Sequence, residues 1–424
     1  MGLGLSVVAD VPRHSLLRRA PTQEQLFQDL AEAVAEFSRH QPSPLEDWQR
    51  SSPSHDVLYV NLLPCEENVE FRLADGRVAC QAKTSTGGPG YHAYLVDVLD
   101  ALRDRLGLDW RSEANAEDET GYLGHRAFPR LQAAMVEWLR GLGGHLCERA
   151  DEMDSPLLLG MSLDFRPVTE AFAASQMGEW PREWFERLVT ADEPELGRLA
   201  EQFFPWWERG VTAKTLRGLG LARSWVDLRW VVPADDNERR LCESVLGCFV
   251  RARELDGSLA LPEAEVRELA ALLAPDAPLR APRPEGVGFL RRSMSLPIPG
   301  GWSIDLPGYY GAQLEDDGGA QVYWFAGRTV RGSSLSFRAK TPRTPAEVLG
   351  AASAEKGELP LALSCRELSG KYTCSAAKDG DGFVLTAQVA KQDGLCIVTI
   401  QFEGEADRAW AESAAASVRA GTFS

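Results

Sequence analysis

Hydrophobic residues in the N-terminal part of the chain recur first with no regular spacing and then with that of a helix. Residues 1–21 carry no clear pattern and are expected to form an irregular lead-in. A helix is predicted from Thr22 onward, because Leu26 and Leu30 lie on one face of a structure with helical period. Such a helix is expected to pack its apolar face against the protein and to expose its polar face.

Short apolar or alternating segments then predict strands. Three neighbouring antiparallel strands are expected at 57–63, 69–73 and 78–82. The sequence Asp75-Gly76 between the last two is typical of a tight hairpin turn. Helices are predicted at 91–106, 128–143, 167–220, 235–255, and from Leu261 to about Ala274. Further strands are predicted at 157–165 and 225–232.

Four prolines mark the clearest domain boundary. Pro275, Pro278, Pro282 and Pro284 remove backbone donors and fix φ, so regular structure is expected to stop there. We therefore predict an N-terminal domain at 1–274, a linker at 275–293 and a C-terminal domain at 294–424. The N-terminal part is expected to be one domain, or two subdomains that divide near residue 150.

The C-terminal region has its own order of elements. Strands are predicted at 302–306, 321–325, 329–337, 362–368, 371–376, 383–390 and 395–403. Thr344-Pro345-Ala346-Glu347 opens a helix, and a last helix runs from Glu405 to about Val418. The whole chain is thus expected to be α+β. Its N-terminal α/β domain would have a mostly antiparallel sheet and many helices, and its C-terminal antiparallel sheet would be flanked by helices.

The C-terminal order, with Pro299-Gly300-Gly301-Trp302 near its start and a closing helix from Trp410, resembles the PsbP/Mog1/DcrB superfamily. The resemblance covers residues 294–424, and residues 1–285 resemble no family that we recognise. Members are mostly non-enzymatic lipoproteins, photosystem subunits, or small chaperones that hold apolar segments of type VI secretion effectors. No lipobox precedes the region, so the resemblance implies the cytosolic chaperone or adaptor branch.

Charge and composition narrow the range of possible functions. The chain has 424 residues and a formal net charge of −17, which argues against a general binder of nucleic-acid backbones. No apolar stretch is long enough to span a bilayer, and no basic segment precedes the apolar N-terminus, so we expect a cytoplasmic protein. The eight cysteines include no C-x-x-C pair and are predicted to be reduced and mostly buried.

A glycine-rich turn between a predicted strand and a predicted helix is the first candidate site. It runs from Lys83 to His92 and opens a helix, whose unpaired N–H groups can hold an anion. The candidate anion-binding residues are Thr84, Ser85, Thr86, Gly87, Gly88, Gly90 and His92. The alternative is a tight turn that needs glycine only for its backbone conformation.

Histidines give weaker candidates. His92 could act as a base with Asp97 or Asp100, although neither lies on its helix face at the ideal spacing. His125 follows the acidic run Glu117-Asp118-Glu119 and could join it around a divalent metal, but a solvated acidic loop is the simpler interpretation. No G-x-S-x-G or H-E-x-x-H motif occurs, so the enzyme hypothesis has no positive signal and stays open.

Aromatic residues give the other candidates, because tryptophan and arginine are favoured at protein interfaces. The candidate partner-binding residues are Trp206, Trp207, Trp302, Tyr309, Tyr310, Tyr323, Trp324, Phe325 and Arg328. Those of the C-terminal region could line an exposed aromatic groove on one sheet face. Strand alternation predicts that Tyr323 and Phe325 share a face and that Trp324 points the other way. The alternative is that these aromatic side chains fill the hydrophobic core and are not exposed.

These patterns favour a non-enzymatic protein that binds another protein. We expect an adaptor, chaperone or immunity-type component of a bacterial secretion or conflict system, whose partner is basic or carries an apolar segment. The alternatives are a small-ligand or anion-binding protein or enzyme that uses the turn at 83–92, and a structural subunit of a larger assembly. No cofactor, metal, nucleic-acid partner or membrane span is predicted, and the oligomeric state is left open.

Overall fold

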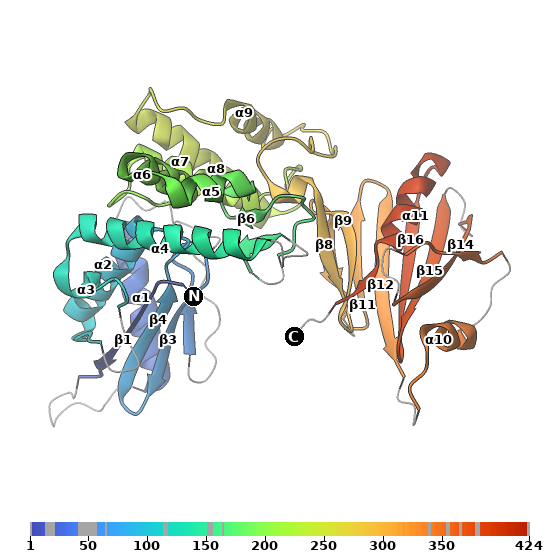
Figure 1. Ribbon diagram of the computed structural model, residues 1–424, viewed down its shortest axis with the longest axis horizontal. Helices are drawn as coiled ribbons and strands as arrows, with labels where there is room; N and C mark the ends of the chain where they lie inside the picture. The colour runs from blue at the N-terminus through green and yellow to red at the C-terminus, as the bar shows by residue number, and fades with distance from the viewer. Residues whose placement is uncertain are drawn as a thin grey trace. The chain divides into compact units, whose positions relative to one another are not determined.

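A computed structural model of the chain describes residues 2–12, 22–40, 57–63, 66–112, 118–150, 156–162, 165–316, 318–337, 341–352, 357–363, 367–377 and 382–421. The chain divides into two compact units, here called the N-terminal and the C-terminal unit. The N-terminal unit comprises 1–162, 169–228 and 233–277, and the C-terminal unit comprises 163–168, 229–232 and 278–424. Both combine helices with mostly antiparallel sheets, which confirms the α+β class (Figure 1).

The first sheet of the N-terminal unit contains the three predicted strands and one more. Its antiparallel order is β1 (Gly4–Asp10), β4 (Arg77–Lys83), β3 (Val69–Ala74) and β2 (Val57–Val60). Asp75 and Gly76 join β3 to β4 with φ values of 53° and 72°, as a type I′ hairpin turn requires. The irregular lead-in expected at 1–21 is wrong for β1, because Leu5, Val7 and Ala9 alternate and bury one face of the strand.

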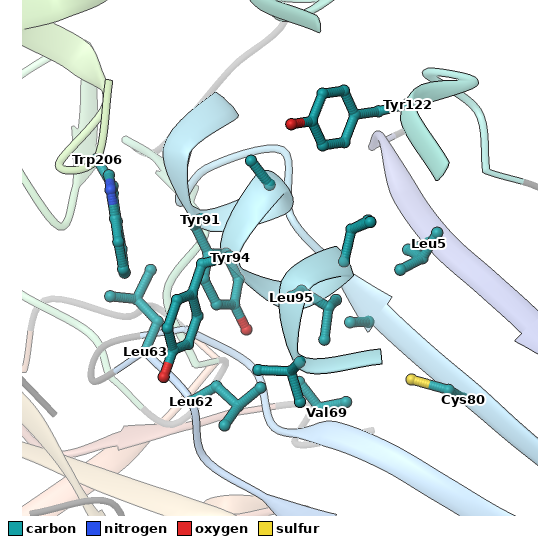
Figure 2. Packing of buried hydrophobic residues seen from close by; sticks show 14 of the residues in the cluster. Leu5, Leu62, Leu63, Val69, Cys80, Tyr91, Tyr94, Leu95, Tyr122 and Trp206 are labelled. Atoms are coloured by element: carbon teal, nitrogen blue, oxygen red, sulfur yellow. The ribbon is translucent and has the colours of Figure 1, made fainter. Parts of the chain in front are cut away.

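Two helices cover the apolar face of this sheet. They are α1 (Gln23–His40), which begins where Thr22 Oγ1 accepts a hydrogen bond from the Gln25 N–H, and α2 (Pro89–Leu106). Figure 2 shows Tyr91 and Tyr94 of α2 pointing toward the segment after β2. This core positions the start of α2, where the glycine-rich turn lies.

The remaining elements of the N-terminal unit are mostly helical. They are α3 (Tyr122–His125), α4 (Phe128–Glu148), β5 (Leu157–Leu159), β6 (Ala173–Ser175), β7 (Gly178–Trp180), α5 (Arg182–Thr190), α6 (Glu193–Phe203), α7 (Ala213–Val226), α8 (Asp236–Leu255) and α9 (Glu263–Leu272). β5 pairs with β6 in parallel, and β6 pairs with β7 antiparallel. None of the helices in the described ranges has the length and apolar composition that a bilayer-spanning segment needs.

Two strand predictions in this part of the chain were wrong. Among the described residues of 157–165, only β5 is a strand, and residues 163 and 164 lie outside the described ranges. The strand expected at 225–232 is replaced by the end of α7 and an irregular segment. Trp230 has a φ of 59°, which interrupts extended backbone. β6 and β7 also interrupt the stretch expected to be helical at 167–220.

The C-terminal unit is built mainly from strands. In chain order it contains the 3₁₀ helix η2 (Phe289–Arg291), β8 (Ser293–Ile298), β9 (Trp302–Pro307), β10 (Gly311–Leu314), β11 (Ala320–Phe325), β12 (Arg328–Ser336), α10 (Pro345–Ala351), β13 (Leu359–Pro360), β14 (Ser369–Ala376), β15 (Phe383–Lys391), β16 (Gly394–Phe402), η3 (Glu405–Asp407), α11 (Arg408–Ala416) and β17 (Arg419–Ala420). The strand expected at 362–368 is absent from residues 361–363, 367 and 368, and residues 364–366 lie outside the described ranges. The edge strand β13 instead precedes that range.

Two sheets enclose the core of the C-terminal unit. Within the described residues, seven strands form an antiparallel sheet in the order β10-β11-β12-β16-β15-β14-β13, and β17-β9-β8 form a second sheet. Tyr323, Val330 and Leu385 of the larger sheet pack with Ile304 of β9 and Ala411 of α11. The opposite face of the larger sheet, here called the open face, meets α10 near Ala390 and Leu395.

Segments from earlier in the chain complete this unit. Pro167 bridges Met294, the Ser295 N–H donates to the Arg166 carbonyl at 2.8 Å, and Val231 joins the core. The Arg291 guanidinium lies 3.7 Å from the centre of the Trp230 ring, a close cation–π contact. Through these contacts, two segments that precede residue 278 in the sequence become part of the C-terminal unit.

Replacing Thr344 with alanine should lower the free energy of unfolding by about 1 kcal/mol. Thr344 Oγ1 accepts the Glu347 N–H at 3.3 Å, and Glu347 Oε2 accepts the Thr344 N–H at 2.8 Å, so the two residues form a capping box at the start of α10. Urea unfolding of wild type, Thr344→Ala and Thr344→Ser measures the effect. Serine keeps the hydroxyl and should retain most of the stability; an equal loss in both variants would contradict the assignment.

Candidate functional site

The glycine-rich turn at 83–92 is mostly buried, and several of its backbone N–H groups have acceptors within the protein. The Gly90 N–H donates to the Trp206 carbonyl at 2.9 Å, and the His92 N–H donates to the Gly88 carbonyl at 3.1 Å. The Trp206 N–H in turn donates to the Gly87 carbonyl at 3.2 Å. This arrangement contradicts the expectation of an open anion cradle and fits the alternative of a tight turn.

The glycines of the turn serve close packing. A Cβ atom added at Gly90 would lie 2.0 Å from Cδ1 of Trp206, and one at Gly88 would lie 2.7 Å from Cβ of Phe204. Gly88 also has a φ of 97°, which residues with side chains rarely adopt. Glycine is therefore required here by the backbone approach of the 204–206 segment, for which the sequence alone offered no signal.

His92 lies in a buried chain of hydrogen bonds. Its Nδ1 is 2.8 Å from Oγ1 of Thr84, its Nε2 is 3.1 Å from Oγ1 of Thr120, and that hydroxyl is 2.7 Å from Oδ1 of Asp118. The Thr120 O–H donates to Asp118, so the Thr120 oxygen can accept a hydrogen bond from Nε2–H of His92. The hydroxyl–imidazole–carboxylate order resembles a catalytic triad, but the side chains of His92 and Asp118 are 0% and 3% exposed.

Asp118, and not Asp97 or Asp100, is the acidic partner of His92. Burial opposes the charge of Asp118, yet the His92 ring 3.4 Å away and hydrogen bonds from Thr120 and the Leu123 N–H (2.6 Å) outweigh it and hold its pKa well below the usual range. The expected pairs of His92 with Asp97 or Asp100 were wrong, because these aspartates lie on the exposed side of α2. The network joins β4, α2 and the start of α3.

A second buried polar cluster lies beneath the turn. Gln176 Nε2 donates to Glu66 Oε1 at 2.7 Å and to the Thr86 carbonyl at 2.9 Å. Burial raises the pKa of Glu66 to about 7, although hydrogen bonding and the charge of Lys83 act in the opposite direction. Among the described residues, Gln176 Oε1 and the hydroxyls of Ser85 and Tyr91 are buried without a hydrogen-bond partner. The carboxyl group of Glu66 is therefore expected to change its charge near neutral pH.

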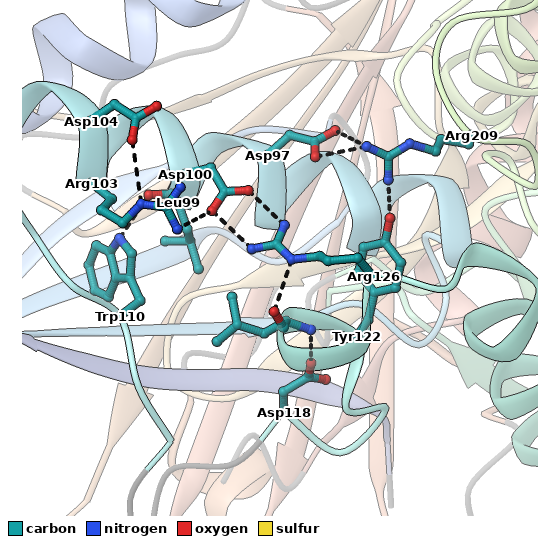
Figure 3. Close-up of polar contacts among 11 residues, drawn as sticks. Asp97, Leu99, Asp100, Arg103, Asp104, Trp110, Asp118, Tyr122, Arg126 and Arg209 are labelled. Atoms are coloured by element: carbon teal, nitrogen blue, oxygen red, sulfur yellow. Dashed lines mark hydrogen bonds and ion pairs between the residues drawn. The ribbon is translucent and has the colours of Figure 1, made fainter.

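Asp97 and Asp100 line a polar hollow of about 430 Å³ on the exposed side of α2 (Figure 3). Arg209 donates two hydrogen bonds to Asp97 at 3.0 and 3.2 Å and a third to the Tyr122 hydroxyl. Arg126 donates to both oxygens of Asp100 at 2.6 and 2.9 Å. Burial raises the pKa of Asp97, and Arg209 partly offsets this. Asp97 pairs with Arg209, and Asp100 is shared by Arg126 and by Arg103 at 3.0 Å, so these pairs anchor α3 and the Arg209 loop to α2.

His125 does not join the acidic run expected beside it. Its Nε2 lies 3.2 Å from the Thr120 carbonyl, and its Nδ1 accepts the Ala127 N–H at 2.9 Å. Glu119 accepts the Gly4 N–H at 2.7 Å, and Glu117 lies outside the described residues. In the part of the chain that the structure describes, no group of three His, Cys, Asp or Glu side chains is arranged to hold a metal ion.

Most of the candidate aromatic residues are buried. Trp302, Tyr309, Tyr310 and Tyr323 lie in the core of the C-terminal unit, and Trp206 lies in the core of the N-terminal unit. The exposed aromatic groove expected from them was wrong, because their rings fill the space between the two sheets or beside α2. Tyr309, Tyr310, Phe325 and Arg328 do come together, and Arg328 stacks on Trp410 with 4.6 Å between Cζ and the ring centre.

Trp324 and Trp207 remain accessible. Trp324 is 43% exposed, whereas its neighbours Tyr323 and Phe325 are buried and half-buried, which confirms the predicted alternation on β11. The indole covers Gly311 of β10, where an added Cβ would lie 2.7 Å from Cε2 of Trp324. Trp207 is half-buried and stacks on Phe204 with a 6° angle between the rings.

The open face around Trp324 is largely uncharged. Trp324 is paired with Thr329, and a neighbouring row runs through Val322, Arg331, Thr399, Thr386 and Thr373. Paired residues of adjacent strands point to the same face, so this row crosses the sheet. Arg331 pairs with Glu315 beside β10, which leaves threonine, valine and tryptophan to dominate the centre of the face.

Comparison with known proteins gives no match: neither a family model nor a curated protein is similar to this chain. The resemblance of residues 294–424 to the PsbP/Mog1/DcrB superfamily therefore stays a prediction.

Proposed function

We propose that this protein binds another protein through the open face of its seven-stranded sheet. In this proposal it is a cytoplasmic, non-enzymatic adaptor, chaperone or immunity-type component of a bacterial secretion or conflict system. The observation that carries the proposal is the exposed Trp324 on a sheet face with few charged residues. Exposed tryptophan is favoured at interfaces because its large rigid ring loses water at a small cost in conformational entropy.

The chemistry of the open face favours an apolar segment as its occupant. The chain carries a net charge of −17, yet the row from Val322 to Thr373 includes no carboxylate. A flat surface of threonine methyl groups, valine and indole gains most from an apolar helix face or strand. The acidic remainder of the protein favours basic residues that flank such a segment, because opposite charges speed association.

The alternative use of the turn at 83–92 as an anion or substrate site loses its main support. The N–H groups of Gly90 and His92 donate to the carbonyls of Trp206 and Gly88, and the side chains of Thr84, Ser85, Thr86 and His92 are buried.

Two synthetic peptides of identical composition test the proposal. One places leucines along one helical face and lysines on the other, and the second is a scrambled sequence. We expect the amphipathic peptide to bind wild type at least tenfold more tightly than the scrambled one, and to change the fluorescence of Trp324. Comparison with Trp324→Phe separates this signal from the other tryptophans.

Variants locate the binding face. Thr386→Glu places a carboxylate at the centre of the open face and should weaken the amphipathic peptide about tenfold, although added negative charge attracts its lysines. Val250→Glu adds the same charge to an exposed position of α8 and serves as the control. Equal binding of both peptides, or no effect of Thr386→Glu, would contradict the proposal.

A further inference from the structure

A second pocket lies in the N-terminal unit, away from the polar hollow and the glycine-rich turn. It encloses about 200 Å³ between the end of α6, the following 204–208 segment and the first turns of α7. Its apolar wall includes Phe204, Pro205, Trp207 and Leu221. Close approach of the backbone shapes it: a Cβ at Gly218 would lie 2.1 Å from the Pro205 carbonyl oxygen, so α7 and the 204–208 segment are in direct contact.

Arg217 lines this pocket, and its charge is not paired with a carboxylate of the described residues. Its Nε atom is buried and has no hydrogen-bond partner among the described residues, and no carboxylate of those residues forms an ion pair with it. Leaving a guanidinium N–H buried and unpaired costs on the order of 1–3 kcal/mol. An anion in the pocket would supply the acceptor that Nε of Arg217 lacks.

The carboxylates nearest to the pocket are already engaged. Lys214 Nζ lies 2.9 Å from Oε1 of Glu201 and 3.5 Å from Oε1 of Glu208. The hydrogen bond that Lys214 donates to Glu201 raises the pKa of Lys214, so its positive charge is held between the two glutamates. Lys214 therefore neutralises one of the two negative charges, which reduces their opposition to an anion beside Arg217.

We propose that this pocket binds a carboxylate that carries a small apolar group. The carboxylate would accept hydrogen bonds from Arg217, and the apolar group would lie against Trp207 and Phe204, whose rings are already stacked. A volume near 200 Å³ suits a short acyl or aryl group, and the apolar wall disfavours a heavily hydrated phosphate. The proposal is independent of the open face of the C-terminal unit.

Such a carboxylate can come from a free small acid or from the C-terminus of a polypeptide. The shared chemistry is one carboxylate next to an apolar side chain. We distinguish the sources with 3-phenylpropanoate for the first and N-acetyl-leucine for the second. The matching primary amides of both compounds lack the negative charge and serve as controls.

Titrations followed by two-dimensional NMR of the tryptophan indole N–H groups test the site in the full chain. We expect at least one acid to bind with a Kd on the order of 1 mM or tighter and to shift the Trp207 signal, with its amide about tenfold weaker. Arg217→Gln should weaken the acid about tenfold, Arg217→Lys should retain part of the affinity, and Arg198→Gln on the exposed side of α6 should change nothing.

The acid that binds identifies the source. Two results would overturn the proposal: failure of both acids to shift Trp207 at tens of millimolar, or binding that Arg217→Gln leaves unchanged in a variant whose urea midpoint matches wild type. Because Arg217→Lys keeps the charge, it guards against a variant that merely fails to fold.

Discussion

Replacing Asp118 with asparagine is expected to lower the free energy of unfolding by about 3 kcal/mol. Asp118 accepts hydrogen bonds from the N–H and hydroxyl of Thr120 and from the Leu123 N–H. An asparagine amide offers one acceptor where the carboxylate offers two, and its NH₂ group would face donors. The buried ring of His92 would also lose the negative charge beside it. The loss therefore reaches both the start of α3 and the first turn of α2.

The effect of Asp118 has a defined pH dependence. Its folded-state pKa lies below the ordinary value of 3.8, so its stabilising contribution is complete above that value and is lost as pH falls further. Urea unfolding from pH 7 to pH 3 should show a constant stability difference between wild type and Asp118→Asn down to about pH 4, which begins to narrow below it. Asp109→Asn, at an exposed position, should stay within about 0.5 kcal/mol of wild type. A gap that widens in acid would contradict the assigned charge state.

Replacing Glu66 with glutamine should raise the free energy of unfolding at pH 8, which is the opposite of the effect expected for Asp118→Asn. The folded-state pKa of Glu66 is about 7 against an ordinary value of 4.5, so the folded protein favours the protonated acid. The stability of wild type should therefore decline as pH rises from about 4.5 to about 7, by up to ~3 kcal/mol. Glutamine keeps the shape and the acceptor for Gln176 but cannot ionise. Glu66→Gln should be the more stable protein at pH 8 and close to wild type near pH 4.5.

The same substitution at the neighbouring residue, Glu67, supplies the control. Glu67 lies next in the chain and forms an exposed ion pair with Lys83 at 3.4 Å. Glu67→Gln should change the urea midpoint little at either pH. If Glu66→Gln and wild type show parallel stability curves from pH 5 to pH 8, the carboxyl group of Glu66 does not titrate in this range.

Local patterns predicted many of the elements, and their failures have local causes. The Asp75-Gly76 hairpin and the capping box at Thr344 were predictable because turn and cap chemistry depends on adjacent residues. β1 was missed although Leu5, Val7 and Ala9 alternate, because Gly2 and Gly4 weaken a strand pattern. Its partner β4 lies about seventy residues away, and that pairing supplies the missing stability.

The candidate sites were harder to predict, because they depend on contacts between distant segments. The acidic run 117–119 was considered with His125 for its proximity in sequence, whereas α2 directs His92 toward Asp118. The glycines at 87–90 signalled a turn, but the 204–206 segment that fills the space above them carries no sequence mark of that role. Aromatic residues alone could not separate core from surface. Only strand alternation at Tyr323 and Trp324 did so correctly.

The composition of the C-terminal unit from three separate stretches of chain limits how this protein can be cut. A gene fragment that encodes only 278–424 omits Pro167, which bridges Met294, and Trp230, on which Arg291 stacks. Ribosomal synthesis delivers those earlier stretches long before the strands they pack against, so they must wait for the rest of the chain to emerge. Evolution by simple shuffling of this unit into other genes is correspondingly hindered, and recombinant work on it calls for the intact polypeptide.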